Sequence, residues 1–194
     1  MSLILPTSPA PASMTVALIS TKNTLTPATG GDEQEIRRKG SNYALTFSMP
    51  VITYSQSMAW SDLHAEGETV VMRVFQPGCD TGAPGAPMVK GAGQIGSSLV
   101  VDGLTPGYVI RKGQFLSVIT GGQRFLYRAR ADVTASGAGE AVILLGTLLR
   151  RPPSDNAVVE ITQPMIEGFV RDLGEWTVGV DRLVSLQFTV RERE

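Results

Sequence analysis

The sequence is poor in the side chains that carry most enzyme and metal chemistry. Its 194 residues include one histidine, His64, and one cysteine, Cys79. A single cysteine excludes an internal disulfide framework, and protein zinc sites ordinarily draw on several cysteine and histidine ligands. We therefore expect no metal site, no cofactor and no enzymatic activity.

Charge and long apolar runs are also scarce. Charged residues make up 18% of the chain and the net charge is −1, so composition gives no whole-molecule case for nucleic-acid binding. No apolar run reaches the roughly 18 residues that predict a transmembrane helix. The first residues, MSLILP, lack a basic region and a long apolar stretch. We expect neither a secretory signal nor a membrane partner.

Signals for turns and short strands are abundant in the sequence, which has 21 glycines and 12 prolines. Segments rich in β-branched and aromatic residues are separated by Gly, Pro, Asn and Asp, which is typical of a sandwich or barrel. The strand candidates are residues 14–20, 42–49, 69–75, 99–101, 115–119, 125–133, 141–149 and 184–190. In the last of these, apolar and polar residues alternate cleanly. The pattern predicts a mainly-β fold, an antiparallel split β-barrel or sandwich with one α-helix.

The helix is expected near residues 56–66, with Ser55 able to cap it and Gly67 able to end it. Residues 24–31 are expected to form a loop. Residues 32–39 pack three acids and then three bases together, which is typical of a solvated face or strand edge.

Residues 1–13 hold three prolines and are expected to form an extended arm preceding one domain, residues 14–194. The apolar start of the arm, Leu3, Ile4 and Leu5, is unusual for a solvated tail. We expect these three residues to contact a neighbouring subunit, with docking on the chain's own domain as the alternative.

Several residues imitate catalytic or binding motifs, and each has a structural interpretation that we favour. His64 and Cys79 could form a nucleophilic pair only if the fold joined them. The run GAGQIG at 91–96 imitates a dinucleotide fingerprint, but the residues that follow it predict a strand where that motif needs a helix. Asp32 and Glu35 would need a cleft to act as paired acids. Arg150 and Arg151 could bind an anion, but we favour a satisfied ion pair.

The order of these segments resembles the distal tail protein family of long-tailed bacteriophages. The resemblance covers roughly residues 30–192 and is carried by four stretches. These are VKGAGQIGSSL (89–99) with the LTPG turn (104–107), IRKGQFLSV (110–118), RFLYRARADVTASGAGEA (124–141) and LLRRPPSDNAVV (148–159). Gln114, where the family usually has aspartate, and the Arg-Pro-Pro run at 151–153 depart from the pattern. The chain is too short for an inserted carbohydrate-binding domain.

The resemblance implies a structural virion protein, a hexameric ring at the tail tip in the baseplate. Such a ring joins the tail tube to the baseplate hub and other tail-tip proteins, around a channel through which DNA passes without sequence-specific binding. It also implies synthesis in the host cytoplasm. Two alternatives stay open. One is another tail-tube or tail-completion protein. The other is a carbohydrate-binding β-sandwich for host attachment, in which Trp60, Trp176, Tyr54 and Tyr108 would line one groove.

Overall fold

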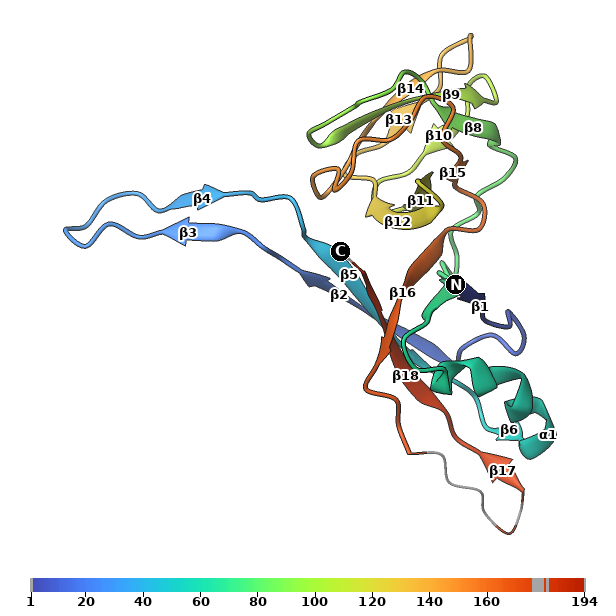
Figure 1. Cartoon of the computed structure of the whole chain (residues 1–194). Coiled ribbons are helices and arrows are strands. Elements are labelled where there is room, and N and C mark those ends of the chain that lie inside the picture. The colour runs from blue at the N-terminus through green and yellow to red at the C-terminus, as the bar shows by residue number, and fades with distance from the viewer. Residues whose placement is uncertain (1, 176–179, 181, 194) are drawn as a thin grey trace.

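The structure, a computed structural model, describes residues 2–175, 180 and 182–193 (Figure 1). In this part of the chain the fold is mainly β with a single α-helix, as the sequence predicts. The strands are β1 Ser2–Ile4, β2 Ser13–Ile19, β3 Asn23–Leu25, β4 Gln34–Ile36, β5 Asn42–Ser48, β6 Ile52–Thr53, β7 Thr69–Arg73, β8 Gly85–Val89, β9 Ser98–Leu104, β10 Val109–Ile110, β11 Phe115–Thr120, β12 Gln123–Arg128, β13 Val133–Thr134, β14 Ala141–Leu144, β15 Val159–Glu160, β16 Met165–Arg171, β17 Leu183–Val184 and β18 Gln187–Glu192.

A six-stranded sheet in the order β1-β7-β16-β18-β5-β2 forms the first unit, which we call the sheet unit. All its pairings are antiparallel except that of β1 with β7. One face packs on the apolar core of the unit, which includes Leu45, Phe47, Trp60 and Phe188. The alternating C-terminal residues all lie in this core, so their expected facing is confirmed. The strand predicted at 184–190 is divided, with Val184 in β17, which pairs with β6, and residues 187–190 in β18. Strand β18 is a central strand, because it pairs with both β16 and β5.

The helical segment differs from the single α-helix expected over residues 56–66. Thr53 caps a short helix, α1 Tyr54–Ser57, through a capping box with Gln56. The chain then tightens into a 3-10 helix, η1 Met58–His64. Its buried residues, Trp60 and Leu63, are three positions apart, and the 3-10 repeat of three residues per turn aligns them on one face. The expected Ser55 cap and the continuous α-helix over residues 56–66 were therefore wrong, and the helical segment ends before Gly67, at Ala65.

Strands β8 to β15 form the second unit, which we call the sandwich unit and which occupies the upper part of Figure 1. Two three-stranded sheets, β14-β9-β8 and β12-β11-β15, enclose a separate apolar core. Isolated bridges join them at Met88–Val158 and at Ala129–Leu145. Within the described residues the sheets do not close into a continuous barrel. The arrangement is sandwich-like, and strands β9, β11, β12 and β14 overlap the segments predicted between residues 91 and 164. The strand predicted at 99–101 extends to Leu104, the one predicted at 125–133 is interrupted after Arg128, and the one predicted at 141–149 ends at Leu144.

Gly168 in β16 permits a close approach to the neighbouring strand β18. A Cβ atom at this position would lie 1.9 Å from the backbone oxygen of Arg191 in β18. The obstacle is backbone of a central strand, so no side-chain rotation relieves it. We expect Gly168→Ala to lower the free energy of unfolding by about 1–3 kcal/mol, the usual cost of overpacking. Urea unfolding measures this loss, and a midpoint equal to that of the unaltered protein would contradict the strand spacing.

Candidate assembly surface

A hairpin extends from strands β2 and β5 away from both units (Figure 1). We call residues 20–41 the projecting hairpin. Its β3 and β4 strands pair antiparallel from Asn23–Ile36 to Leu25–Gln34. Every residue from 22 to 39 is exposed. The expected solvent exposure of the charge run at 32–39 is confirmed, whereas the expected loop over 24–31 begins with strand residues.

Little within the chain supports the projecting hairpin. An ion pair joins Lys22 to Glu35, and the Thr26 hydroxyl donates to Glu33 over 3.3 Å. Exposed ion pairs of this kind stabilise by at most about 1 kcal/mol. An isolated two-stranded hairpin is marginally stable in water. The projecting hairpin therefore lacks, in its own chain, the packing that normally orders such a ribbon.

Apolar side chains are present on this unsupported ribbon. Leu25 is 51% exposed and Ile36 is 45% exposed. The register of β3 and β4 places both on one face of the hairpin. Strand β2, from which the hairpin rises, is an edge strand and adds Val16 and Leu18, which are 37% and 50% exposed. An exposed edge with apolar side chains favours pairing with another chain.

The N-terminal residues lie on the chain's own sheet. Strand β1 pairs in parallel with β7, and the Leu5 amide donates to the Val71 oxygen over 2.9 Å. Leu5 is 2% exposed and belongs to the core of the sheet unit, so its expected role as an intersubunit contact is corrected. Leu3 is half-buried, whereas Ile4 is 69% exposed. Contact of Leu3 and Ile4 with a neighbouring subunit stays a prediction.

Buried carboxylates join the two units where edge strand β12 of the sandwich unit meets the sheet unit. The Glu192 side chain, at the end of β18, accepts the Tyr43 amide and the Leu126 amide, each over 2.7 Å. Glu167 in β16 accepts the Arg124 amide over 2.9 Å. Amides of an edge strand need acceptors when they are buried. We call Glu167 and Glu192, with the β12 amides that they accept, the carboxylate junction.

Arg150 neutralises Glu192 within this junction. Its guanidinium forms an ion pair with Glu192 in which both side chains are at least 95% buried. The guanidinium carbon also lies 5.0 Å from the ring centre of Phe125 and 5.5 Å from that of Tyr127. Burial raises the pKa of the Glu192 carboxyl, although Arg150 and the two amides oppose this. Desolvation lowers the pKa of Arg150, but attraction to Glu192 outweighs it and leaves that pKa raised. The ion pair favoured for Arg150 is confirmed, although its Nε and Nη1 atoms have no hydrogen-bond partner in the part of the chain that the structure describes. Arg151 is exposed and takes part in no ion pair among the described residues, so the same expectation was wrong for it.

The residues with catalytic potential do not form a site. His64 ends η1 and is exposed, whereas Cys79 lies in the loop between β7 and β8. Cys79 borders a cavity of about 410 Å³, and the described residues lining that cavity include no histidine. Asp32 and Glu35 both lie on the projecting hairpin, where Glu35 pairs with Lys22.

The GAGQIG run forms a turn that the chain's own atoms occupy. The Gly91 amide donates to the Asp155 carboxylate over 2.7 Å, and the Gly93 amide donates to the Pro153 oxygen over 3.0 Å. The Gln94 side chain brackets the Val100 backbone. Strand β9 follows directly, as the sequence predicts. Two of the amides that could cradle a phosphate in a dinucleotide motif are thus already bonded within the chain.

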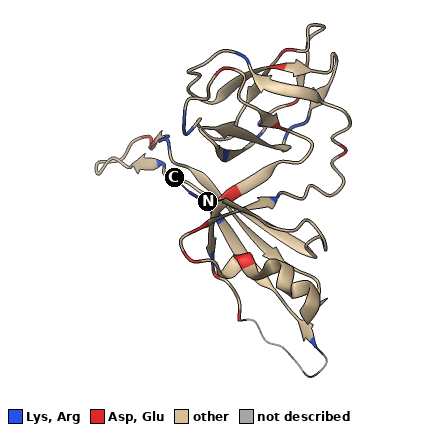
Figure 2. Cartoon of the chain, turned by 45° about the vertical axis from the view of Figure 1, so that its right-hand side comes forward, with Lys and Arg blue, Asp and Glu red and all other residues tan. Residues whose placement is uncertain are grey.

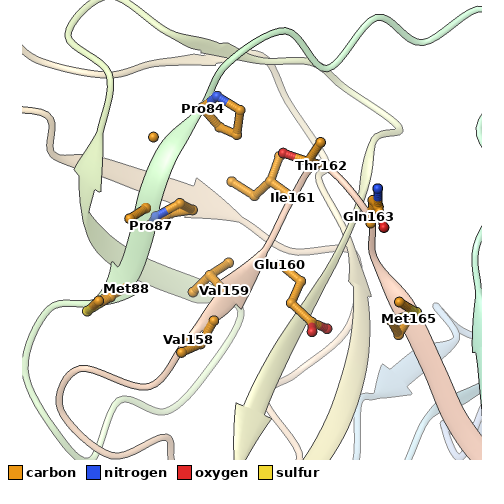
Figure 3. Close-up of a pocket in the computed structure, with 12 residues that line it drawn as sticks. Pro84, Pro87, Met88, Val158, Val159, Glu160, Ile161, Thr162, Gln163 and Met165 are labelled. Atoms are coloured by element: carbon orange, nitrogen blue, oxygen red, sulfur yellow. The ribbon is translucent and has the colours of Figure 1, made fainter. Parts of the chain in front are cut away.

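A cavity of about 320 Å³ lies between β8 and β15, and Figure 3 shows the residues that line it. Prolines and apolar side chains predominate in its lining, with Pro84, Pro87, Val158 and Ile161 among them. Glu160 is the one charged residue in the lining, and its carboxylate already accepts from Arg124 and Ser117. The cavity therefore offers no free acid or base.

The aromatic groove required for carbohydrate binding is not assembled as hypothesised. Trp60 is fully buried in the core of the sheet unit and cannot stack on a sugar. The Tyr108 hydroxyl donates to the Thr81 oxygen, while Tyr54 is 50% exposed on α1. Trp176 lies outside the described residues. The sequence alone could not show whether a tryptophan lies in the core or on a surface that stacks against a sugar.

Three further observations concern the class of protein. Within the described ranges, no three His, Cys, Asp or Glu side chains are grouped so that they could hold a metal ion. No helix there has the length and apolar character needed to cross a membrane. No protein-family model matches the chain, and no curated protein matches it.

Proposed function

We propose that this protein is a structural subunit of a bacteriophage tail tip, a hexameric distal tail ring that joins the tail tube to the baseplate hub. The observation that carries the proposal is the projecting hairpin. It is a long, exposed ribbon with Leu25 and Ile36 on one face and no core of its own. Burial of those side chains requires a second chain, so the geometry favours assembly.

A ring also needs two different, complementary patches on each subunit, because head-to-tail contacts close only through a heterologous interface. The projecting hairpin with edge strand β2 supplies one candidate patch. Strand β1 at the opposite edge of the same sheet, with Ile4 exposed, supplies a second. The sequence resemblance adds the virion location, the tail-tube and baseplate-hub partners and the DNA channel. Synthesis in the host cytoplasm belongs to the same proposal.

Assembly is tested by changing the hairpin while sparing the cores. We expect the unaltered protein to form closed six-fold rings in negative-stain images, with a matching mass by light scattering. Leu25→Glu with Ile36→Glu is expected to leave a monomer whose melting temperature is unchanged, because neither side chain belongs to a core. Ile95→Glu is the matched control, since Ile95 is 65% exposed in a turn of the sandwich unit.

The outcomes separate the alternatives. Rings that persist in the Leu25→Glu, Ile36→Glu variant would exclude the hairpin from the interface. A protein that stays monomeric at all concentrations would contradict self-assembly into a ring. Long tubes in place of single rings would identify a tail-tube protein, which is the alternative closest in architecture.

A further inference from the structure

The face of the six-stranded sheet opposite the apolar core carries an unusual row of side chains. Cross-strand register aligns Phe169 in β16 with Arg191 in β18, Ala44 in β5 and Ala17 in β2. The adjacent row aligns Arg171 with three threonines, Thr189, Thr46 and Thr15. Paired residues share one face of a sheet. This outer face therefore combines guanidinium groups with a floor of small and hydroxyl side chains.

Among the described residues, the positive charge on this face is only partly neutralised. Arg171 and Arg191 are exposed, and neither takes part in an ion pair among the described residues. Arg193 lies beside them and makes one long contact, 3.7 Å, with Glu167. The three arginines line one groove of about 310 Å³ with Asn42, Phe169 and Glu192. The Glu192 carboxylate is already taken by Arg150 and two amides. The groove thus keeps an excess of positive charge, although charges of both signs are scattered over the chain as a whole (Figure 2).

An aromatic ring lies between the charges. Phe169 is 36% exposed, directly opposite Arg191, and the Arg171 guanidinium carbon is 5.9 Å from its ring centre. Phenylalanine on the exposed face of a strand has no packing role in the core behind it. Guanidinium groups beside an exposed ring are the combination by which proteins hold single-stranded nucleic acid, with phosphates on arginine and bases on the aromatic face.

We propose that this groove binds a single-stranded nucleic-acid segment. Arg171, Arg191 and Arg193 hold backbone phosphates, and Phe169 stacks against a base. Inorganic phosphate would satisfy the arginines but leave Phe169 unused, and a lipid surface would not need the aromatic ring within a groove. The observations therefore favour nucleic acid. The proposal does not depend on ring formation, because every residue of the groove comes from one chain.

Fluorescence anisotropy with a labelled oligothymidylate of about 20 nucleotides, long enough to span one such groove, tests the proposal on the full chain. We expect Arg171→Gln with Arg191→Gln to weaken binding. The slope of log affinity against log salt is expected to fall by about 1.4, since each single-strand phosphate contact contributes about 0.7. Phe169→Leu is expected to weaken binding of the oligothymidylate by at least about fivefold, with little effect on a duplex of the same length.

The control is Arg111→Gln with Arg130→Gln, which removes the same charge from exposed arginines of the sandwich unit. Equal weakening by this variant would show attraction to the whole molecule and overturn the site. Absence of oligothymidylate binding at low salt would overturn it too. The proposal would also be overturned if only inorganic phosphate, or only vesicles containing phosphatidylglycerol, bound through Arg171 and Arg191. Circular dichroism of each variant keeps misfolding from being mistaken for loss of binding.

Discussion

Glu192→Gln is expected to lower the free energy of unfolding by about 3–5 kcal/mol, the usual cost of removing one partner from a buried ion pair. Arg150 is 95% buried and would be left with an uncompensated charge. The glutamine also offers one acceptor oxygen where the carboxylate offered two to the Tyr43 and Leu126 amides. Urea or thermal unfolding at neutral pH measures the loss.

The same substitution at Glu140 is the matched control. Glu140 pairs with Lys90 at the surface, where the two side chains are 42% and 45% exposed. Exposed pairs contribute at most about 1 kcal/mol, so Glu140→Gln should leave the unfolding midpoint nearly unchanged. If the two variants unfolded alike, the carboxylate junction would have no special role in stability.

A double variant distinguishes the contribution of the ion pair to stability from the contribution of side-chain packing at the carboxylate junction. Glu192→Leu with Arg150→Met replaces both charged groups by apolar ones of similar size. Buried ion pairs are often no more stabilising than such replacements, so we expect the double variant to recover part of the loss. The two backbone amides would still lack their acceptor, which prevents full recovery. A double variant less stable than Glu192→Gln would show that the amide contacts outweigh the ion pair.

The sequence contains a signal for the carboxylate junction, but the junction was not predicted from it. Val184, Leu186, Phe188 and Val190 lie on the core side of an alternating segment, and Glu192 continues the same period of two. An acidic residue at a core-facing position of an alternating strand indicates a buried carboxylate that has hydrogen-bond or ion-pair partners. Its partners could not be inferred, because they come from β5, β12 and the segment after β14.

The long strands were predictable because alternation or β-branched composition is strong in them. Strands β2, β5, β7, β9 and β11 all overlap their predicted segments. Part of the projecting hairpin was not predicted, because apolar and polar residues do not alternate in residues 23–25 and these residues pack on no core. Strand β1 was missed for a different reason. The prolines at positions 6, 9 and 11 indicate an extended arm, but the sequence cannot show that residues 2–4 pair with β7.

Turn signals had a more limited value. Asp102-Gly103 was taken to close the strand at 99–101, yet β9 continues to Leu104. Gly103 has a φ of 69° within that strand, and a Cβ there would lie 2.4 Å from the Ala86 oxygen of β8. The glycine therefore permits an irregular, closely approaching pair of strands. An isolated glycine signal cannot distinguish such a bulge from a turn.

Phe188→Ala is expected to cost about 3–5 kcal/mol of unfolding free energy, the range for deleting a large buried aromatic side chain. Phe188 is fully buried at the centre of the sheet unit. Its ring centre lies 5.4 Å from that of Phe47 and 6.0 Å from that of Trp60. Removal therefore leaves a cavity and also breaks contacts between β18, β5 and η1. The loss should appear as a lower melting temperature and as altered tryptophan fluorescence.

Phe169→Ala provides the matched comparison, because Phe169 lies on the outer face of the same sheet and is 36% exposed. Its removal forfeits far less buried surface, so the melting temperature should fall much less. The two variants together test the facing of the sheet, since β16 and β18 are neighbours and only the direction of the side chain differs. Equal destabilisation would mean that another chain or segment covers the outer face. A melting temperature unchanged by Phe188→Ala would show that the C-terminal strand does not face the core.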